Sequence, residues 1–196
     1  MNSRFMIIGD MLLMTASSSP QEIRPEADDC RIITKTDLAD PEAPDFKAYQ
    51  VTGGQVVAKP RLDLTSNPFA RRYRTVLRRD ITKGPNYAGQ YRVVVWGCGS
   101  SCAMFAVVNL KTGRVITPKG FSAVSGVHLG AGDFLPNTDS DSWGFRFRSN
   151  SRMLVVTGAL DEDDAREGAY YFSLEGERLR PIHSTVVKRN CDTAKH

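Results

Sequence analysis

Residues 91–110 read YRVVVWGCGSSCAMFAVVNL, two runs of β-branched and aromatic side chains on either side of a short Gly, Ser and Cys segment. Runs of this composition favour strands. Gly97 and Gly99 permit positive φ, so we expect residues 97–102 to form a tight turn between the two strands. A second turn at Lys111-Thr112-Gly113 then leads into a strand over 114–117. The stretch therefore predicts an antiparallel hairpin that continues as a meander.

The same pattern continues toward the C-terminus. Strands are predicted over residues 143–147, 153–158, 169–174 and 178–182, with turns between them. Short strands separated by turns every eight to twelve residues or so are typical of antiparallel architectures. The predicted fold class is mainly β (α+β): an antiparallel meander, as a sandwich, a partial barrel or a propeller-like sheet, with one amphipathic helix.

That helix precedes the first strand. Ser66 or Asn67 can cap it, Pro68 suits its first position, and the Lys83-Gly84-Pro85 segment ends it, which predicts a helix over 67–82. Its apolar side chains recur at spacings of three and four and are Phe69, Tyr73, Val76, Leu77 and Ile81. The spacing places them on one face, which we expect to pack on the sheet.

The charge of the chain is concentrated on this helix. The 196 residues carry a formal charge of +4, whereas residues 67–83, the helical segment together with Lys83, carry +5. The charge of the whole chain is mild for a nucleic-acid binder, and because residues 1–18 also resemble an export signal, we expect no nucleic-acid partner. Arginine forms paired contacts with carboxylate and phosphate, so the cluster is a candidate anion-binding or partner-binding surface. The alternative is an ordinary solvated face. The residues are Arg71, Arg72, Arg74, Arg78 and Arg79.

The N-terminal part divides into two segments. Residues 1–18 have the order of an export signal, with Arg4, a mainly apolar stretch and then small residues, although Asp10 interrupts the stretch. The alternative is a buried N-terminal strand or helix. Residues 19–65 form a proline-rich, acidic and irregular lead, predicted to drape over the β-rich domain of residues 66–196. No apolar run approaches the ~18 residues of a membrane span. We expect a periplasmic or secreted monomer without a transmembrane segment in its mature form.

The four cysteines agree with export. Cys98 and Cys102 are close in sequence and suit a small bridge, which leaves Cys30 and Cys191 near the two ends of the mature chain. Three pairings remain open, as does the alternative of four free thiols in a cytosolic protein. Thiol exchange by Cys98 and Cys102 is a further hypothesis, but redox sites of the thioredoxin type have two intervening residues at a helix start. A structural bridge is the preferred interpretation.

Catalytic and metal-binding patterns are weak. No nucleophile elbow, no zinc spacing and no complete calcium loop occurs, so we predict no catalytic residue, no metal and no cofactor. The alternative is an envelope enzyme whose pocket gathers an aromatic and polar cluster. Its residues would be Tyr87, Gln90, Tyr91 and Trp96.

Residues 86–91, 96–102 and 106–115 carry three motifs: Asn-Tyr-Ala-Gly-Gln-Tyr, then Trp-Gly-Cys-Gly-Ser-Ser-Cys, then a hairpin with Lys-Thr-Gly at its turn. They resemble a family of short exported proteobacterial proteins that has no assigned activity. The family has Asn-(Phe/Tyr)-Ala-Gly-His-Tyr, then Trp-Gly-Cys-Gly-(Ser/Thr)-x-Cys, then a Lys-Thr-Gly hairpin, so Gln90 stands in place of its histidine. Glutamine keeps hydrogen bonding but cannot transfer a proton near neutral pH.

Together the residues favour a non-catalytic binding or interaction module in the periplasm or outside the cell. Its expected partner is an unknown envelope protein or envelope polymer. The envelope enzyme and the thiol-disulfide protein stay as alternatives.

Overall fold

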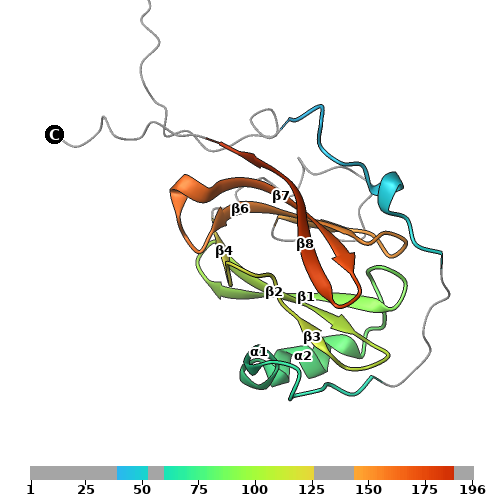
Figure 1. The fold of residues 1–196 in the computed structure, drawn as a ribbon. Helices are drawn as coiled ribbons and strands as arrows, with labels where there is room; N and C mark the ends of the chain where they lie inside the picture. Colours follow the sequence, from blue (N-terminus) through green and yellow to red (C-terminus); the bar gives the residue numbers. More distant parts are fainter. Residues whose placement is uncertain (1–38, 53–59, 126–143, 188–196) are drawn as a thin grey trace, which may run out of the picture.

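The computed structural model describes residues 39–52, 60–125 and 144–187 (Figure 1). They form one eight-stranded antiparallel sheet in the order β1-β2-β4-β6-β7-β8, with β3 paired to β2 and β5 paired to β6. The predicted mainly β, antiparallel fold is confirmed. The strands are β1 (Tyr91–Gly99), β2 (Cys102–Asn109), β3 (Val115–Ile116), β4 (Val124–Ser125), β5 (Phe145–Phe147), β6 (Met153–Leu160), β7 (Glu167–Glu175) and β8 (Arg178–Val186).

The open sheet curls around its main hydrophobic core. Figure 1 shows β6, β7 and β8 lying over β1 and β2. Side chains from both halves meet between them, because alternate residues of each strand point to the same face. The buried aromatic members of this central core are Tyr87, Phe105, Phe121, Phe145, Phe147 and Phe172.

Two helices cover the other face of β1 and β2. They are α1 (Pro68–Arg72) and α2 (Arg74–Ile81), where the sequence predicts one helix over 67–82. Tyr73 has a non-helical ψ of 23° and separates them, while its ring packs 5.0 Å from that of Trp96 on β1. The apolar face continues across the break: Leu77 and Ile81 are buried against the sheet, and Phe69, Tyr73 and Val76 pack beside them.

Residues 39–52 of the lead lie against the outer face of β6, β7 and β8, whereas residues 60–65 run beside the turn before β3, where the Asp63 amide donates to the Gly113 carbonyl. The 3-10 helix η1 (Phe46–Tyr49) begins at Asp45, whose side chain accepts from the Lys47 amide. Phe46 is 5% exposed and packs with Met153, Val155 and Tyr171 in a third cluster. A second 3-10 helix, η2 (Asp164–Arg166), connects β6 to β7.

A bulge in the last hairpin changes which side chains of β8 face the central core and which face the outside of the sheet. Phe172 pairs with Pro181 but Tyr171 pairs with His183, so one extra residue, Ile182, stands on β8. Because side chains alternate along a strand, the extra residue reverses the facing of the residues after it. Leu179 therefore faces the central core, whereas His183, also at an odd-numbered position, contacts Tyr171 on the outer face.

Several strands differ in extent from their predicted ranges. The strands β6, β7 and β8 are longer than predicted, β3 is shorter, and β4 has no predicted counterpart. With two residues, β4 is too short to produce an alternating pattern, and pairing with β2 and β6 defines it. Within the described ranges, none of the helices is both long and apolar enough to span a bilayer.

Candidate functional site

The predicted arginine surface lies on the outward side of α1 and α2. All five arginines are exposed, and in the described parts of the chain none of them has an ion-pair partner. We call these residues the arginine face: Arg71, Arg72, Arg74, Arg78 and Arg79.

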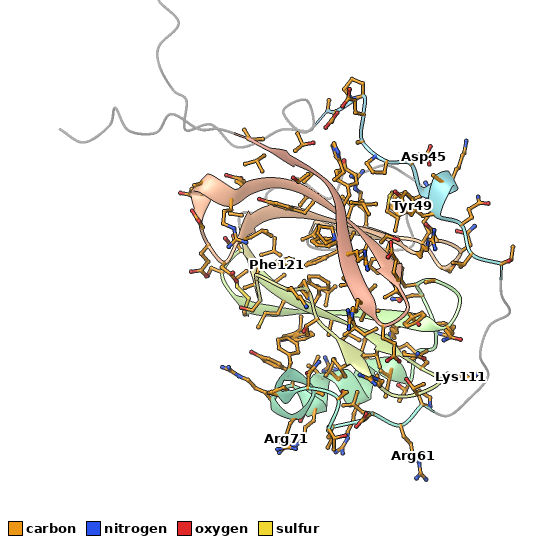
Figure 2. The ribbon with its side chains drawn as sticks, viewed as in Figure 1. Asp45, Tyr49, Arg61, Arg71, Lys111 and Phe121 are labelled. Atoms are coloured by element: carbon orange, nitrogen blue, oxygen red, sulfur yellow. A yellow bond between two sulfur atoms is a disulfide. The ribbon has the colours of Figure 1, made fainter. Side chains whose placement is uncertain are left out.

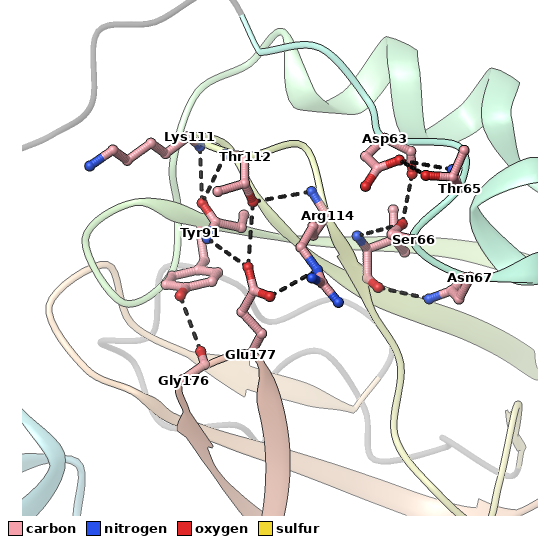
Figure 3. Close-up of polar contacts among 12 residues, drawn as sticks. Asp63, Thr65, Ser66, Asn67, Tyr91, Lys111, Thr112, Arg114, Gly176 and Glu177 are labelled. Atoms are coloured by element: carbon pink, nitrogen blue, oxygen red, sulfur yellow. Dashed lines mark hydrogen bonds and ion pairs between the residues drawn. The ribbon is translucent and has the colours of Figure 1, made fainter.

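The helices that carry this face are held firmly to the sheet. Asn67 caps α1 by accepting from the Ala70 amide at 2.8 Å, and its own amide group donates to the Val115 carbonyl at 2.7 Å. Figure 3 shows this tie to β3, together with the Ser66 hydroxyl, which accepts from the Val115 amide. Since the cap and the buried Leu77 and Ile81 fix the backbone, the arginines are presented from a rigid support.

Neighbouring acidic side chains do not neutralise the face, because they are engaged elsewhere. Asp80, the one acidic residue of α2, pairs with Lys83 at 2.5 Å and with Arg92 of β1 at 2.7 Å. Burial raises the pKa of Asp80, but its hydrogen bonds to Lys83 and Arg92 outweigh this and lower the pKa overall. Asp63, which precedes α1, accepts from the Thr65 amide at 2.8 Å and from the Thr65 hydroxyl at 2.6 Å.

Three of the arginines line a surface pocket of about 440 Å³. Arg71, Arg72 and Arg74 line one part of it. The first residue of α1, Pro68, and the segment before it line the rest, through Leu64, Thr65 and Asn67. No acidic residue lines it. Figure 2 labels Arg71, whose side chain extends away from the sheet. The pocket is suited to an anionic group, which arginines bind through charge-assisted hydrogen bonds.

Of the four residues of the predicted aromatic pocket, Tyr87 and Tyr91 lie together and pair in a β-bridge, whereas Trp96 lies on the other face of the sheet. Tyr87 is fully buried in the central core and donates its hydroxyl hydrogen to the Arg152 carbonyl, and its burial raises the pKa of the phenol. Tyr91 packs against the same core and donates to the Gly176 carbonyl at 3.2 Å. Trp96 packs in the helix-covered cluster on the opposite face of β1. The Gln90 amide lies 3.5 Å from Asn109 Oδ1.

Cys98 and Cys102 form a disulfide at the tip of the β1–β2 hairpin, with their Cα atoms 5.2 Å apart. Cys98 is exposed and Cys102 is buried. Neither lies at the start of a helix, the position that activates the thiols of thioredoxin-like proteins. Cys30 and Cys191, the other predicted bridge, lie outside the described residues.

A second pocket was not predicted from the sequence. It has a volume of about 640 Å³ and lies where β7 and β8 meet the segment between β3 and β4. Lys119, Phe121, Arg166 and Leu179 are among its lining residues. They come from segments far apart in the chain, so no local pattern could identify the pocket.

No family model matches this chain, and no curated protein or solved structure matches it. In the ranges 39–52, 60–125 and 144–187, no three His, Cys, Asp or Glu side chains are grouped so as to hold a metal ion.

Proposed function

We propose that the protein is an exported, non-catalytic interaction module that binds an anionic envelope protein or envelope polymer through its arginine face. The observation that carries this proposal is the set of five exposed arginines without ion-pair partners in the described ranges. Asp80 of α2 and Asp63, which precedes α1, are engaged in other contacts. A rigid cluster of unpaired guanidinium groups favours carboxylate or phosphate partners.

Export is supported by the order of residues 1–18 and by the Cys98–Cys102 disulfide, because disulfides persist in oxidising compartments. The resemblance of the turn motifs to exported proteins supports the same compartment. A periplasmic or secreted location places anionic polymers and the acidic surfaces of envelope proteins within reach of the arginine face.

The test compares two double variants with equal change of net charge. Arg71→Glu with Arg74→Glu reverses two pocket-lining arginines, and Lys47→Glu with Lys111→Glu reverses two exposed lysines elsewhere. Binding of the full chain to immobilised poly-glutamate is measured as a function of salt. We expect the arginine variant to lose at least about tenfold in affinity, since each hydrogen bond to a charged group contributes about 1.5–3 kcal/mol. The lysine variant should change by less than about threefold.

Capture from an envelope extract then identifies the class of partner. The wild-type chain should retain a component that the arginine variant loses and the lysine variant keeps. Prior protease treatment of the extract abolishes the capture if the partner is a protein and leaves it intact if the partner is a polymer. Equal losses in both variants would show that net charge, rather than the arginine face, drives binding, and would overturn the proposal.

A further inference from the structure

The pocket of about 640 Å³ beside β8 is distinct from the arginine face and shares no lining residue with it. Its volume lies in the range of about 300–1,000 Å³ typical of small-molecule sites. Figure 2 labels Phe121, which lies between the two halves of the curled sheet. The pocket therefore opens onto the central core.

Apolar side chains form the floor of this pocket. Phe121, Leu160, Phe172 and Leu179 all belong to the central core and are 4–9% exposed. The rings of Phe121 and Phe172 lie 5.9 Å apart, and Phe121 also contacts Phe105 at 6.0 Å. Because these side chains are fixed by packing on the core side, the floor is preformed and presents a hydrocarbon surface.

The bulge in β8 completes the floor. Leu179 pairs with Leu174, and Pro181 pairs with Phe172. Because paired residues point to the same face, Leu179 and Pro181 lie on the core side of the sheet, as Leu174 and Phe172 do. Pro181 has no backbone N–H, and β8 is the last strand of the sheet, the position where a proline is tolerated within a strand. Beyond Ile182 the facing reverses, so the floor ends at Pro181.

The remaining lining side chains are mostly basic. Four basic residues and no acidic residue line the pocket. Arg166 pairs with Asp161 at 3.5 Å and Arg180 pairs with Glu175 at 2.9 Å. Lys119 and Arg178 are exposed and have no ion-pair partner in the described parts of the chain. A positive charge beside a hydrocarbon floor is complementary to a molecule with an apolar body and an anionic head.

We propose that this pocket binds a small free carboxylic acid with an apolar body, such as a medium-chain alkyl carboxylate. The hydrocarbon part lies on Phe121, Phe172 and Leu179, and the carboxylate is held by Lys119 and Arg178. This makes the protein a carrier or sensor of amphipathic acids in addition to its interaction through the arginine face.

The experiment uses the full chain and three probes, with decanoate kept below its micellar concentration and 1-decanol below its solubility limit. Decanoate has both the apolar body and the anionic head, 1-decanol has the body alone, and acetate has the head alone. Calorimetry should show decanoate binding at least about tenfold more tightly than 1-decanol, with no measurable acetate binding. Decanoate should also shift the methyl NMR signals of Leu160 and Leu179, which line the floor.

The variant Lys119→Glu with Arg178→Glu tests the charged rim. We expect it to lower decanoate affinity at least about tenfold and to leave 1-decanol affinity within about threefold of wild type. Lys47→Glu with Lys111→Glu, which makes the same change of net charge away from the pocket, should leave both affinities unchanged. Circular dichroism of each variant checks that the fold is kept.

Three results would overturn the proposal: equal affinity for decanoate and 1-decanol, methyl shifts confined to residues outside the pocket, or equal losses in the two charge variants. The variant Arg71→Glu with Arg74→Glu separates the two sites. It should lower poly-glutamate affinity at least about tenfold without altering decanoate binding, so either proposal can fail while the other stands.

Discussion

The first and last hairpins of the sheet have similar strand lengths but are held in different ways. The β1–β2 hairpin turns at Ser100 and Ser101, and the Cys98–Cys102 disulfide links its strands beside this exposed tip. The β7–β8 hairpin has no such link in the described residues. Its turn at Gly176 and Glu177 instead contacts the opposite half of the sheet.

The contrast shows which hairpin connects the two halves of the curled sheet. In Figure 3, Tyr91 of β1 donates to the Gly176 carbonyl, and Glu177 pairs with Arg114 at 2.8 Å. These contacts join chain positions more than sixty residues apart. A local bridge constrains only its own turn, whereas long-range contacts connect the two halves around the central core. We therefore expect changes in the last hairpin to alter global stability more than changes in the first.

The largest expected effect comes from Gly168→Ala in β7. A Cβ atom at this position would lie 2.2 Å from the Thr185 carbonyl oxygen and 3.0 Å from the Val186 Cα. Backbone atoms cannot move aside as a flexible side chain does, so β8 must shift. We expect the free energy of unfolding to fall by about 3 kcal/mol, the upper part of the range for overpacking. Urea denaturation measures this change.

The matched control is Gly97→Ala in the first hairpin. Its Cβ atom would meet only the Cys102 carbonyl oxygen, at 3.9 Å, which is ordinary contact. The free energy of unfolding should change by less than about 0.5 kcal/mol. Equal losses for the two alanine variants would contradict the idea that the last hairpin is the more tightly packed one.

Removal of the disulfide should have the next largest effect. The variant Cys98→Ser with Cys102→Ser opens a loop with a sequence separation of 4. Chain entropy predicts a loss of about 2 kcal/mol for so short a loop. Urea denaturation of the variant and of the wild-type chain, both without reductant, measures this loss, since a reductant would also open the predicted Cys30–Cys191 bridge. A variant as unstable as Gly168→Ala would show that the first hairpin also has a global role.

The same contrast explains what the sequence predicts of the fold. Alternation and turn residues identify the strands of both hairpins, because these signals are local. The apolar face of the helices was also predicted, since Phe69, Leu77 and Ile81 recur at helical spacing and all contact the sheet. The bulge at Ile182 was not predicted, because it arises from the pairing of two strands rather than from either strand alone.

The candidate sites divide in the same way. The arginine face is local to one helical segment, and its residues could be named from the sequence, although its role stays a proposal. Closeness in the sequence predicts that Tyr87 and Trp96 share one pocket. In the structure they lie on opposite faces of the sheet. The second pocket joins Phe121 to Leu179, and only the curl of the sheet brings these residues together.

A smaller effect is expected from Glu177→Gln. The pair with Arg114 is partly exposed, with side-chain exposures of 53% for Arg114 and 31% for Glu177, so its loss should cost about 0.5 kcal/mol. The control is Glu175→Gln, which removes the pair with Arg180 within β7 and β8 and leaves the opposite half of the sheet untouched. Its cost in urea denaturation should be smaller still. A larger loss for Glu175→Gln would mean that the contact between the halves adds little stability.

The smallest expected effect concerns the outer face of β8 beyond the bulge. Asp40 Oδ2 lies 2.7 Å from His183 Nε2 and accepts from the Thr185 hydroxyl at 2.8 Å. The hydrogen bonds from His183 and Thr185 lower the pKa of Asp40 below its ordinary value of 3.8. A lowered carboxyl pKa means that the contact stabilises the folded chain above pH 3.8 and is lost as the pH falls through the folded-state value.

The backbone NMR signals of Thr185 should therefore show an acidic transition below pH 3.8 in the wild-type chain. Asp40→Asn should remove this acidic transition, because the amide does not titrate. The Leu179 signals, on the core side before the bulge, should stay unchanged in both proteins. If the Leu179 signals followed the same titration, the bulge would not separate the two faces of β8. The conclusion that β8 contacts the central core before the bulge and the lead after it would then be wrong.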